Sequence, residues 1–211
     1  MPDEARLESL AYESPNTLVM SQASSASVLD IFRQTGAILE GHFLLTSGRH
    51  SGTYLEKFRV LEYPEQTQQL CRLIAERFRD SGVQLVAGPT TGGIILSFEL
   101  ARQLGVRGIF AEKVEGGRRF LRGFRIEPGE RTLVVDDILT TGGSVREVLD
   151  EVGRWRGQVV GVGILVNRAA EAVDMGVPLF ACHSLAISSY PPDNCPLCAR
   201  GLPLVKPGGG A

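Results

Sequence analysis

Two successive segments between residues 85 and 166 each run from a short apolar stretch through a Gly- and Thr-rich loop into an amphipathic helix and then into another apolar stretch. The predicted strand, loop, helix and strand are 85–87, 88–93, 94–104 and 106–110 in the first segment, and 132–135, 136–143, 144–155 and 159–166 in the second. Each segment is therefore a βαβ pattern. Two consecutive βαβ units predict an α/β fold with a central, mostly parallel sheet, right-handed crossovers and helices on both faces.

The composition is that of an ordinary globular domain. The chain has 211 residues, of which 43% are hydrophobic and 22% charged, which suits one domain with a buried core. The formal net charge of -2 gives no general attraction to phosphate polyanions or acidic membranes. We therefore expect no nucleic-acid partner and no membrane partner.

The sequence lacks the signals of a membrane or secreted protein. Its longest apolar run, 159–166, is far shorter than the roughly 18–20 residues that cross a bilayer. Asp3, Glu4 and Glu8 stand where a secretory signal would carry basic and then apolar residues. Four cysteines are too few for a disulfide scaffold of this length. We expect a cytoplasmic protein.

Both ends of the chain lack a sustained hydrophobic period. We predict a flexible leader at 1–25, a single domain at 26–205 and a flexible tail at 206–211. Within the domain, residues 112–129 are polar and rich in Gly and Arg, and they are too long for a simple connection between strands. We predict that they form a lid or a hairpin extension with a functional role; a solvated excursion without one is the alternative.

The segment 133–144 carries the strongest chemical signal. An apolar strand ends in two acids and leads through a Thr- and Gly-rich loop into a helix that Ser144 and Glu147 could cap. Free N–H groups in the loop and the first helical turn would cradle a phosphate monoester, and small residues let the backbone approach it. The hydroxyls of Thr140, Thr141 and Ser144 add donors. A capped helix with solvated acids is the alternative without a ligand.

Asp136 and Asp137 are adjacent carboxylates that would repel each other unless they face different partners. Successive side chains at a strand end point in opposite directions, so one acid can reach ribose hydroxyls while the other meets Mg²⁺ or a backbone donor. Acids beside a phosphate cradle indicate a sugar phosphate. The sequence has neither a Gly-x-x-x-x-Gly-Lys-Ser/Thr motif nor a helix-opening Gly-x-Gly-x-x-Gly, which disfavours P-loop nucleotidases and dinucleotide binders.

The segment 134–144 resembles the phosphoribosyl-pyrophosphate motif of type I phosphoribosyltransferases. This resemblance implies the type I fold, a Mg²⁺ cofactor, and catalytic roles for Lys113, Asp136 and Asp137. It also implies that phosphoribosyl pyrophosphate contacts a larger set of residues: Lys113, Asp136, Asp137, Ile138, Leu139, Thr140, Thr141, Gly142, Gly143 and Ser144. Residues 88–93 match the pyrophosphate loop of the same family.

The segment 36–54 resembles the hood that closes over the base in orotate phosphoribosyltransferases, and we place the hood at about 36–60. Judged alone, the segment could also be an ordinary strand and turn. The resemblance covers roughly 28–190. It assigns orotate binding to Ser47, Gly48, Tyr54, Thr140 and Arg168. Ser47 and Gly48 offer donors, Tyr54 offers a flat face, and the guanidinium of Arg168 fits a carboxylate. The implied function is transfer of a 5-phosphoribosyl group to orotate, giving orotidine 5′-monophosphate and diphosphate, by a homodimer in pyrimidine biosynthesis.

The sequence departs from the family pattern where cations are common. Thr46 and Gly92 stand where many members carry lysine, and the usual lysine-rich catalytic loop is replaced by Glu112-Lys113-Val114-Glu115-Gly116-Gly117-Arg118-Arg119. Our hypothesis is that Arg118 or Arg119 supplies the missing charge on the leaving group, in its own chain or across a dimer interface.

Two other functions fit part of the pattern. A purine phosphoribosyltransferase would keep the motif at 136–144 without needing the hood. A non-catalytic regulator that senses phosphoribosyl pyrophosphate and binds nucleic acid should have a basic face, which the net charge does not favour.

Cys195 and Cys198 have the spacing of half a zinc knuckle. The only nearby candidate complement is Cys182-His183, and we favour a tight terminal turn with buried thiols over metal binding. We assign no metal ligands from the sequence, and we treat His42 and His50 as hood residues without a catalytic role.

Overall fold

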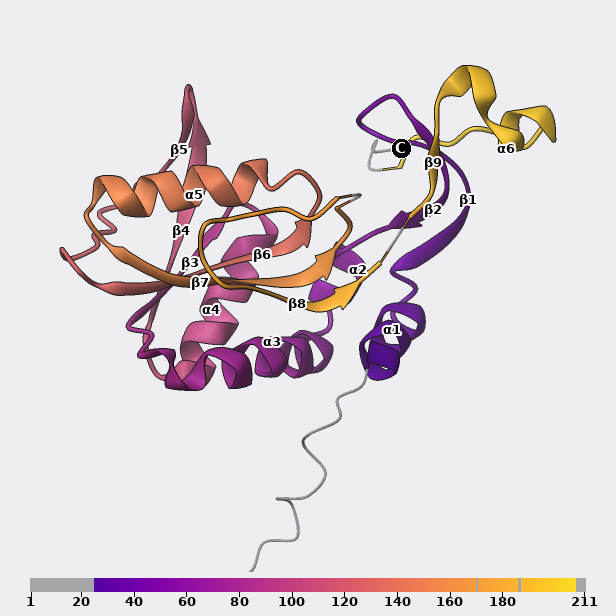
Figure 1. Cartoon of the computed structure of the whole chain (residues 1–211). Helices are drawn as coiled ribbons and strands as arrows, with labels where there is room; N and C mark the ends of the chain where they lie inside the picture. The colour runs from indigo at the N-terminus through magenta and orange to yellow at the C-terminus, as the bar shows by residue number, and fades with distance from the viewer. Residues whose placement is uncertain (1–24, 170, 186, 208–211) are drawn as a thin grey trace, which may run out of the picture.

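A computed structural model describes residues 25–169, 171–185 and 187–207, so most of the predicted leader and residues 208–211 of the predicted tail lie outside the described residues. The described chain forms two sheets (Figure 1). The larger has six strands in the order β5-β4-β3-β6-β7-β8: β5 (Gly117–Arg119), β4 (Arg107–Val114), β3 (Leu85–Pro89), β6 (Arg131–Leu139), β7 (Gln158–Asn167) and β8 (Leu179–Ser184). All neighbours pair in parallel except β4 and β5. The predicted α/β fold is confirmed.

Helices cover both faces of this sheet (Figure 1). On one face lie α3 (Pro64–Phe78), extended by the 3-10 turn η1 (Arg79–Ser81), and α4 (Gly92–Leu104); on the other lies α5 (Gly143–Arg154). There is one hydrophobic core on each face of the sheet, and alternate strand residues point into one or the other. Leu133 and Val135 pack in the core beneath α3 and α4, and Val134 packs in the core beneath α5. The helix α1 (Ser25–Gln34) joins the α3/α4 core through Val28 and Phe32.

The strand β6 is longer than the sequence predicts. Its parallel pairing with β7 continues past the acids to Ile138↔Val166 and Leu139↔Asn167, so residues 136–139 belong to the strand and not to the loop. The apolar pattern stops at the first acid, whereas backbone hydrogen bonding to β7 does not depend on side-chain polarity. The acids are therefore held by a rigid sheet.

The Arg-rich segment begins as a hairpin extension. β4 continues to Val114 and turns through Gly116 and Gly117, both with positive φ, into β5. Phe120 and Ile126 beyond β5 are buried against the α5 core. Of the two predicted forms, this conformation is the hairpin.

The second sheet is the hood, and it joins a hairpin near the start of the described chain to a strand near its end. β1 (Ile38–Leu44) and β2 (His50–Leu55) form an antiparallel hairpin, and β9 (Ser189–Tyr190) pairs with β2. After β9 the chain continues through the 3-10 turn η2 (Pro192–Asn194) and α6 (Pro196–Ala199), beside the hairpin (Figure 1). A short helix, α2 (Phe58–Leu61), links the hood to α3.

Among the described residues, no helix has the length and apolar character needed to cross a bilayer.

Candidate functional site

A cavity of about 770 Å³ lies where the hood meets the carboxyl ends of β3 and β6. In open α/β sheets ligands bind outside the carboxyl ends of the strands. The hood, the loop after β3, the loop after β6 and the residue that follows β7 all contribute to its lining. The predicted residues that line it are Ser47, Tyr54, Asp136, Asp137, Ile138, Thr140, Thr141, Ser144 and Arg168.

The acid pair is buried at the base of this cavity. Asp136 accepts hydrogen bonds from the Ser144 hydroxyl (2.8 Å) and from the backbone N–H of Asp137 (2.9 Å). Burial, and then the charge of Asp137, raise the pKa of Asp136 to about 6. The two acids face different partners, as the strand-end argument predicts, because Asp137 pairs with Lys57 at 2.9 Å.

Lys57 was missed by the sequence reasoning. Lys57 follows β2, lines the cavity on the hood side, and donates a hydrogen bond to Asp137. Its position just after the hood motif could have indicated it, because the end of β2 must approach the sheet for the hood to cover the site. Lys57 places a cation close to the site although Thr46 and Gly92 are not lysines.

The phosphate loop is built differently from the predicted capping box. Gly142, with φ of 79°, precedes the first residue of α5, so Ser144 is not the cap. The hydroxyl of Ser144 bonds Asp136, and Glu147 pairs with Lys113 and Arg118. The capping-box prediction is wrong because Ser144 and Glu147 find partners on β6 and on the β4–β5 hairpin, and a local spacing pattern does not show such contacts.

The remaining predicted residues shape the loop between β6 and α5. Leu139 is buried in the α5 core, and a side chain at Gly142 would overlap Met175. Gly143 is the first residue of α5. Thr140 and Thr141 are exposed at the cavity wall, and Arg146 braces the loop by donating to the Thr141 carbonyl at 2.6 Å.

The hood and the end of β7 bring Ser47, Tyr54 and Arg168 to one cavity. Within the described residues, Nε of Arg168 is buried and has no hydrogen-bond partner. Burial lowers the pKa of Arg168 and raises the pKa of Tyr54. Gly48 differs from expectation: it is the positive-φ residue of the hairpin turn, and its N–H already donates to the Leu45 carbonyl at 2.9 Å.

Of the three cations considered for the leaving group, Arg118 lines the cavity. Its Nη1 donates to the Thr90 hydroxyl at 3.0 Å in the loop after β3. Lys113 is 60% exposed and pairs with Glu147 at 2.5 Å on the surface of α5. Arg119 turns toward Glu151 at 3.5 Å. In a single chain, Arg118 rather than Arg119 or Lys113 can therefore meet a leaving group in this cavity.

Over residues 59–178 the sequence matches the family described as phosphoribosyl transferase domain. It is 51% identical over 181 residues to the orotate phosphoribosyltransferase of Desulforamulus reducens, and the match covers 86% of this chain and 95% of the relative. This chain belongs to the orotate phosphoribosyltransferase family. The resemblance seen in the motifs, and with it the enzyme class, is confirmed.

Solved structures show the same fold. The orotate phosphoribosyltransferase of Aeropyrum pernix has a TM-score of 0.64 at 26% identity, covering 75% of this chain and 93% of that one. The adenine phosphoribosyltransferase of Rhodothermus marinus has a TM-score of 0.60 at 22% identity, covering 76% of this chain and 99% of that one, which concerns the fold alone. The fold is thus shared by enzymes for different bases, and the sequence relationship separates the orotate family from the purine alternative.

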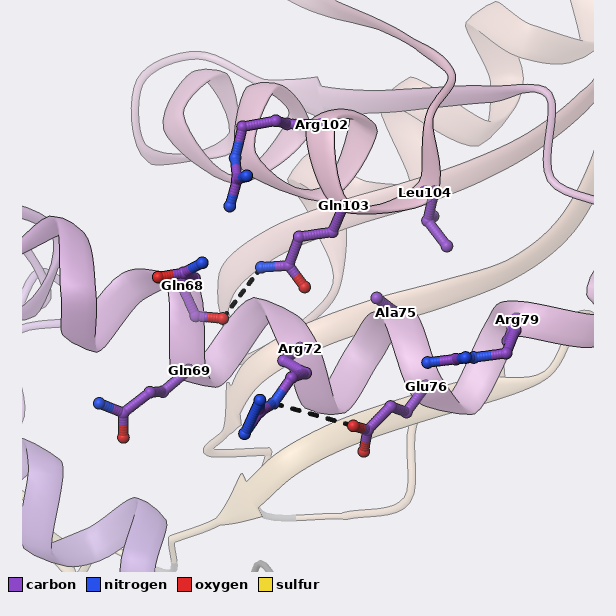
Figure 2. A pocket seen from close by; sticks show the side chains of 9 residues that line it. All are labelled: Gln68, Gln69, Arg72, Ala75, Glu76, Arg79, Arg102, Gln103 and Leu104. Carbon is purple, nitrogen blue, oxygen red and sulfur yellow. Dashed lines mark hydrogen bonds and ion pairs between the residues drawn. The ribbon is translucent and has the colours of Figure 1, made fainter. Parts of the chain in front are cut away.

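A second hollow of about 540 Å³ lies between α3 and α4, away from the strand ends (Figure 2). Several of its polar side chains pair within the protein: Gln103 donates to the Gln68 carbonyl at 3.0 Å, and Arg72 lies 3.8 Å from Glu76 (Figure 2). The cavity under the hood, where the acids, threonines and Arg168 meet, is therefore the candidate active site.

Gly92→Ala is expected to reduce kcat/KM by about 10-fold or more, because an added Cβ would overlap the Asp137 carboxylate and push it from Lys57. The same overlap means that Gly92→Lys, which restores the common family residue, should also impair this enzyme. Steady-state kinetics check both variants. Gly153→Ala is the matched control, since its Cβ meets nothing within 4 Å on α5. Full activity of Gly92→Ala would contradict this account of the glycine.

Proposed function

We propose that this protein transfers the 5-phosphoribosyl group of phosphoribosyl pyrophosphate to orotate, giving orotidine 5′-monophosphate and diphosphate, in the cavity under the hood. The observation that carries the proposal is the half-buried Arg168, which lines the same cavity as the acid pair and the Thr140–Thr141 loop and whose buried Nε has no hydrogen-bond partner within the described residues. A half-buried guanidinium with an unpaired Nε calls for an anion, and a carboxylate matches its planar fork. Orotate carries such a carboxylate beside a ring that can lie against Tyr54.

The donor binds along the side of the cavity formed by β6, the following loop and the start of α5. The N–H groups of the 140–144 loop and the start of α5 hold the 5-phosphate, helped by the Thr140 and Thr141 hydroxyls. Asp136 and Asp137 accept hydrogen bonds from the ribose hydroxyls. Fixing both ends of the sugar orients its anomeric carbon toward the orotate nitrogen, so binding energy is used for alignment.

The C1–O bond breaks toward an oxocarbenium-like centre, and the leaving diphosphate takes the electron pair. Arg118, held by Thr90 at the entrance of the pyrophosphate loop, stabilises that developing charge. Orotate attacks through a ring nitrogen that it can present without its proton, so the reaction needs no dedicated protein base.

Mg²⁺ fits the charge balance of the site. Two buried carboxylates face one lysine, and hard oxygen donors are what Mg²⁺ prefers. Asp136 and Asp137 are the residues that would hold it, directly or through water, and the ion would supply further neutralisation of the diphosphate.

An acceptor panel tests the proposal. With phosphoribosyl pyrophosphate as donor, we expect diphosphate release with orotate and Mg²⁺, and a loss of at least about 100-fold with adenine, guanine or xanthine, because each lacks the carboxylate that Arg168 binds. Omitting Mg²⁺ should abolish turnover. Equal turnover of a purine base would contradict the orotate assignment.

We also propose that the protein acts as a homodimer that shares its active sites. Apolar side chains are exposed on α2 and α4, with Phe98 71% exposed, Phe58 43% and Ile95 37%. The hairpin directs Lys113 away from its own cavity, which suits a contribution to the partner's leaving-group site. The reducing cytoplasm suits an enzyme whose described cysteines are free thiols.

Mixing two inactive variants tests the sharing. If Lys113 acts in the partner's cavity, a mixture of Lys113→Ala and Arg168→Ala dimers after subunit exchange should recover about a quarter of wild-type activity, because each mixed dimer then holds one intact site. Size-exclusion chromatography with light scattering gives the oligomeric state. If the mixture stays inactive although mixed dimers form, Lys113 does not act across the interface.

A further inference from the structure

Four metal-ligand side chains meet in the hood, and none of them lines the substrate cavity. His42 lies on β1, His50 on β2, Cys195 just before α6 and Cys198 within it. One ligand atom from each residue lies within 4.8 Å of all the others. The two histidines are more than a hundred residues from the two cysteines in sequence, so only the fold creates the cluster.

The spacing of these atoms matches a tetrahedral ion. Bonds of about 2.0–2.1 Å to nitrogen and 2.3 Å to sulfur place ligand atoms roughly 3.3–3.8 Å apart around one zinc ion. The separations are 3.0 Å between His42 Nε2 and His50 Nδ1, 3.5 and 3.7 Å from His42 Nε2 to the sulfurs of Cys195 and Cys198, and 3.3 Å from His50 Nδ1 to the sulfur of Cys198. The three nitrogen–sulfur distances fall in the range expected around a common centre, and the nitrogen–nitrogen distance is slightly shorter.

Hydrogen bonding among the four does not account for the arrangement. The Leu202 carbonyl lies 2.8 Å from His42 Nδ1 and can only accept, so Nδ1 carries the proton and Nε2 presents its one lone pair. Three polar atoms approach that single lone pair, which can accept one good hydrogen bond. A cation at the centre satisfies all of them, and a ligating histidine whose other nitrogen donates to a backbone carbonyl is the usual support of such a site.

Burial and position point to a structural role. His42, His50 and Cys195 are each about 5% exposed or less, and Cys198 is exposed at the rim, where an ion can enter. These residues join the hairpin to the C-terminal segment in a small sheet that contributes little to the two hydrophobic cores. Small lobes of this kind commonly need a metal or another cross-link to hold together.

We propose that His42, His50, Cys195 and Cys198 bind one Zn²⁺ ion that ties the C-terminal segment to the hood. Two thiolates and two imidazoles in a tetrahedron favour zinc among the common divalent ions. Four protein ligands complete the coordination, so the ion is structural and is separate from the Mg²⁺ chemistry of the substrate cavity. Binding deprotonates both thiols and releases their protons to solvent. The predicted complement Cys182-His183 is not part of this site, because Cys182 points to the Leu70 carbonyl beneath β8.

Metal analysis of the full-length protein, expressed with zinc and purified without chelator, tests the proposal. We expect about one zinc per chain, and a Co²⁺-substituted sample should show the visible and thiolate charge-transfer absorption of tetrahedral cobalt. Removing the ion should lower the midpoint of thermal unfolding, and added Zn²⁺ should restore it.

Variants locate the ligands. The pair Cys195→Ser with Cys198→Ser should lose at least about nine-tenths of the bound zinc, whereas Cys182→Ala, a cysteine outside the cluster, should keep it. Wild-type protein without zinc that gives no cobalt spectrum would overturn the proposal, whether its thiols are free or joined in a disulfide. Retention of zinc by the double variant would also overturn it. Because metal content is read directly, neither outcome depends on the proposed reaction.

Discussion

Arg168→Ala is expected to lower kcat/KM for orotate by about 100- to 1,000-fold, because truncating a half-buried, charged hydrogen-bond donor that pairs with a substrate carboxylate costs about 3 kcal/mol or more. Within the described residues the Nε of Arg168 has no protein partner, so removing the side chain leaves no buried group unpaired in the free enzyme. Folding should therefore change little while orotate binding is lost. Steady-state kinetics with each substrate varied in turn separate the two contributions.

The expected pattern is a large rise in the KM for orotate with a smaller change in the KM for phosphoribosyl pyrophosphate. Arg168→Lys should recover only part of the activity, since an ammonium cannot make the two parallel bonds of a guanidinium. Arg72→Ala, a surface arginine of the hollow between α3 and α4, is the control and should match the wild type. Unchanged orotate kinetics in Arg168→Ala would remove the observation on which the acceptor assignment rests.

Asp136→Asn should nearly abolish activity and yet make the free protein more stable at pH 7.5. Asp136 has a folded-state pKa of about 6, raised from 3.8 mainly by burial. A carboxyl group whose pKa is raised on folding binds its proton more tightly in the native state, so its ionisation opposes folding at every pH above about 6. The neutral amide avoids that cost, which is on the order of 2–3 kcal/mol.

The stability gain should be present at pH 7.5, shrink as pH falls through about 6, and vanish only below about pH 3, where the wild-type carboxyl is protonated in both states. Urea unfolding of both proteins at these pH values measures it. Asp150→Asn, an exposed acid on α5, is the control and should show no such dependence. A variant that is equally destabilised at all pH values would mean that Asp136 stabilises the fold, contrary to its environment. Activity should fall by about 1,000-fold or more because the ribose loses a charged acceptor.

This opposition between stability and function is visible in the geometry. The site holds two carboxylates near Lys57 at the end of a buried strand. A well-packed apolar pair at the same place would give a more stable folded state. The ligand and its ion then complete the charge balance.

The chemistry of residues 136–144, which we assign to the sugar phosphate, could be predicted from sequence because its signals are local. The acids, the Thr-Gly loop and the following helix occupy one continuous segment, and their order alone places them at a sheet edge. Arg168 was identified through the family resemblance, since one arginine after an apolar strand carries little information by itself.

What the sequence could not indicate are contacts between distant segments. Lys57 reaches Asp137 only because the hood folds over the sheet. Likewise, Glu147 pairs with Lys113 and Arg118 only because the β4–β5 hairpin lies beside α5. The cysteine pair was noted at once, but its histidine partners were hidden in a strand hairpin more than a hundred residues away. Local spacing shows which groups can act; the sheet register determines which of them meet.

The pairing of Val205 with the hood has a consequence for how the enzyme is made. Its N–H donates to the His42 carbonyl and its carbonyl accepts from Leu44, both at 2.8 Å, while β9 closes the other side of the hairpin. A ribosome therefore delivers the α/β core well before it delivers the last pieces of the lobe that covers the base. A chain that ends some twenty residues early would retain the site for the sugar phosphate but lack the Val205 pairing that holds the hood hairpin. Premature termination should therefore give a product that folds and binds the donor but has much lower catalytic activity.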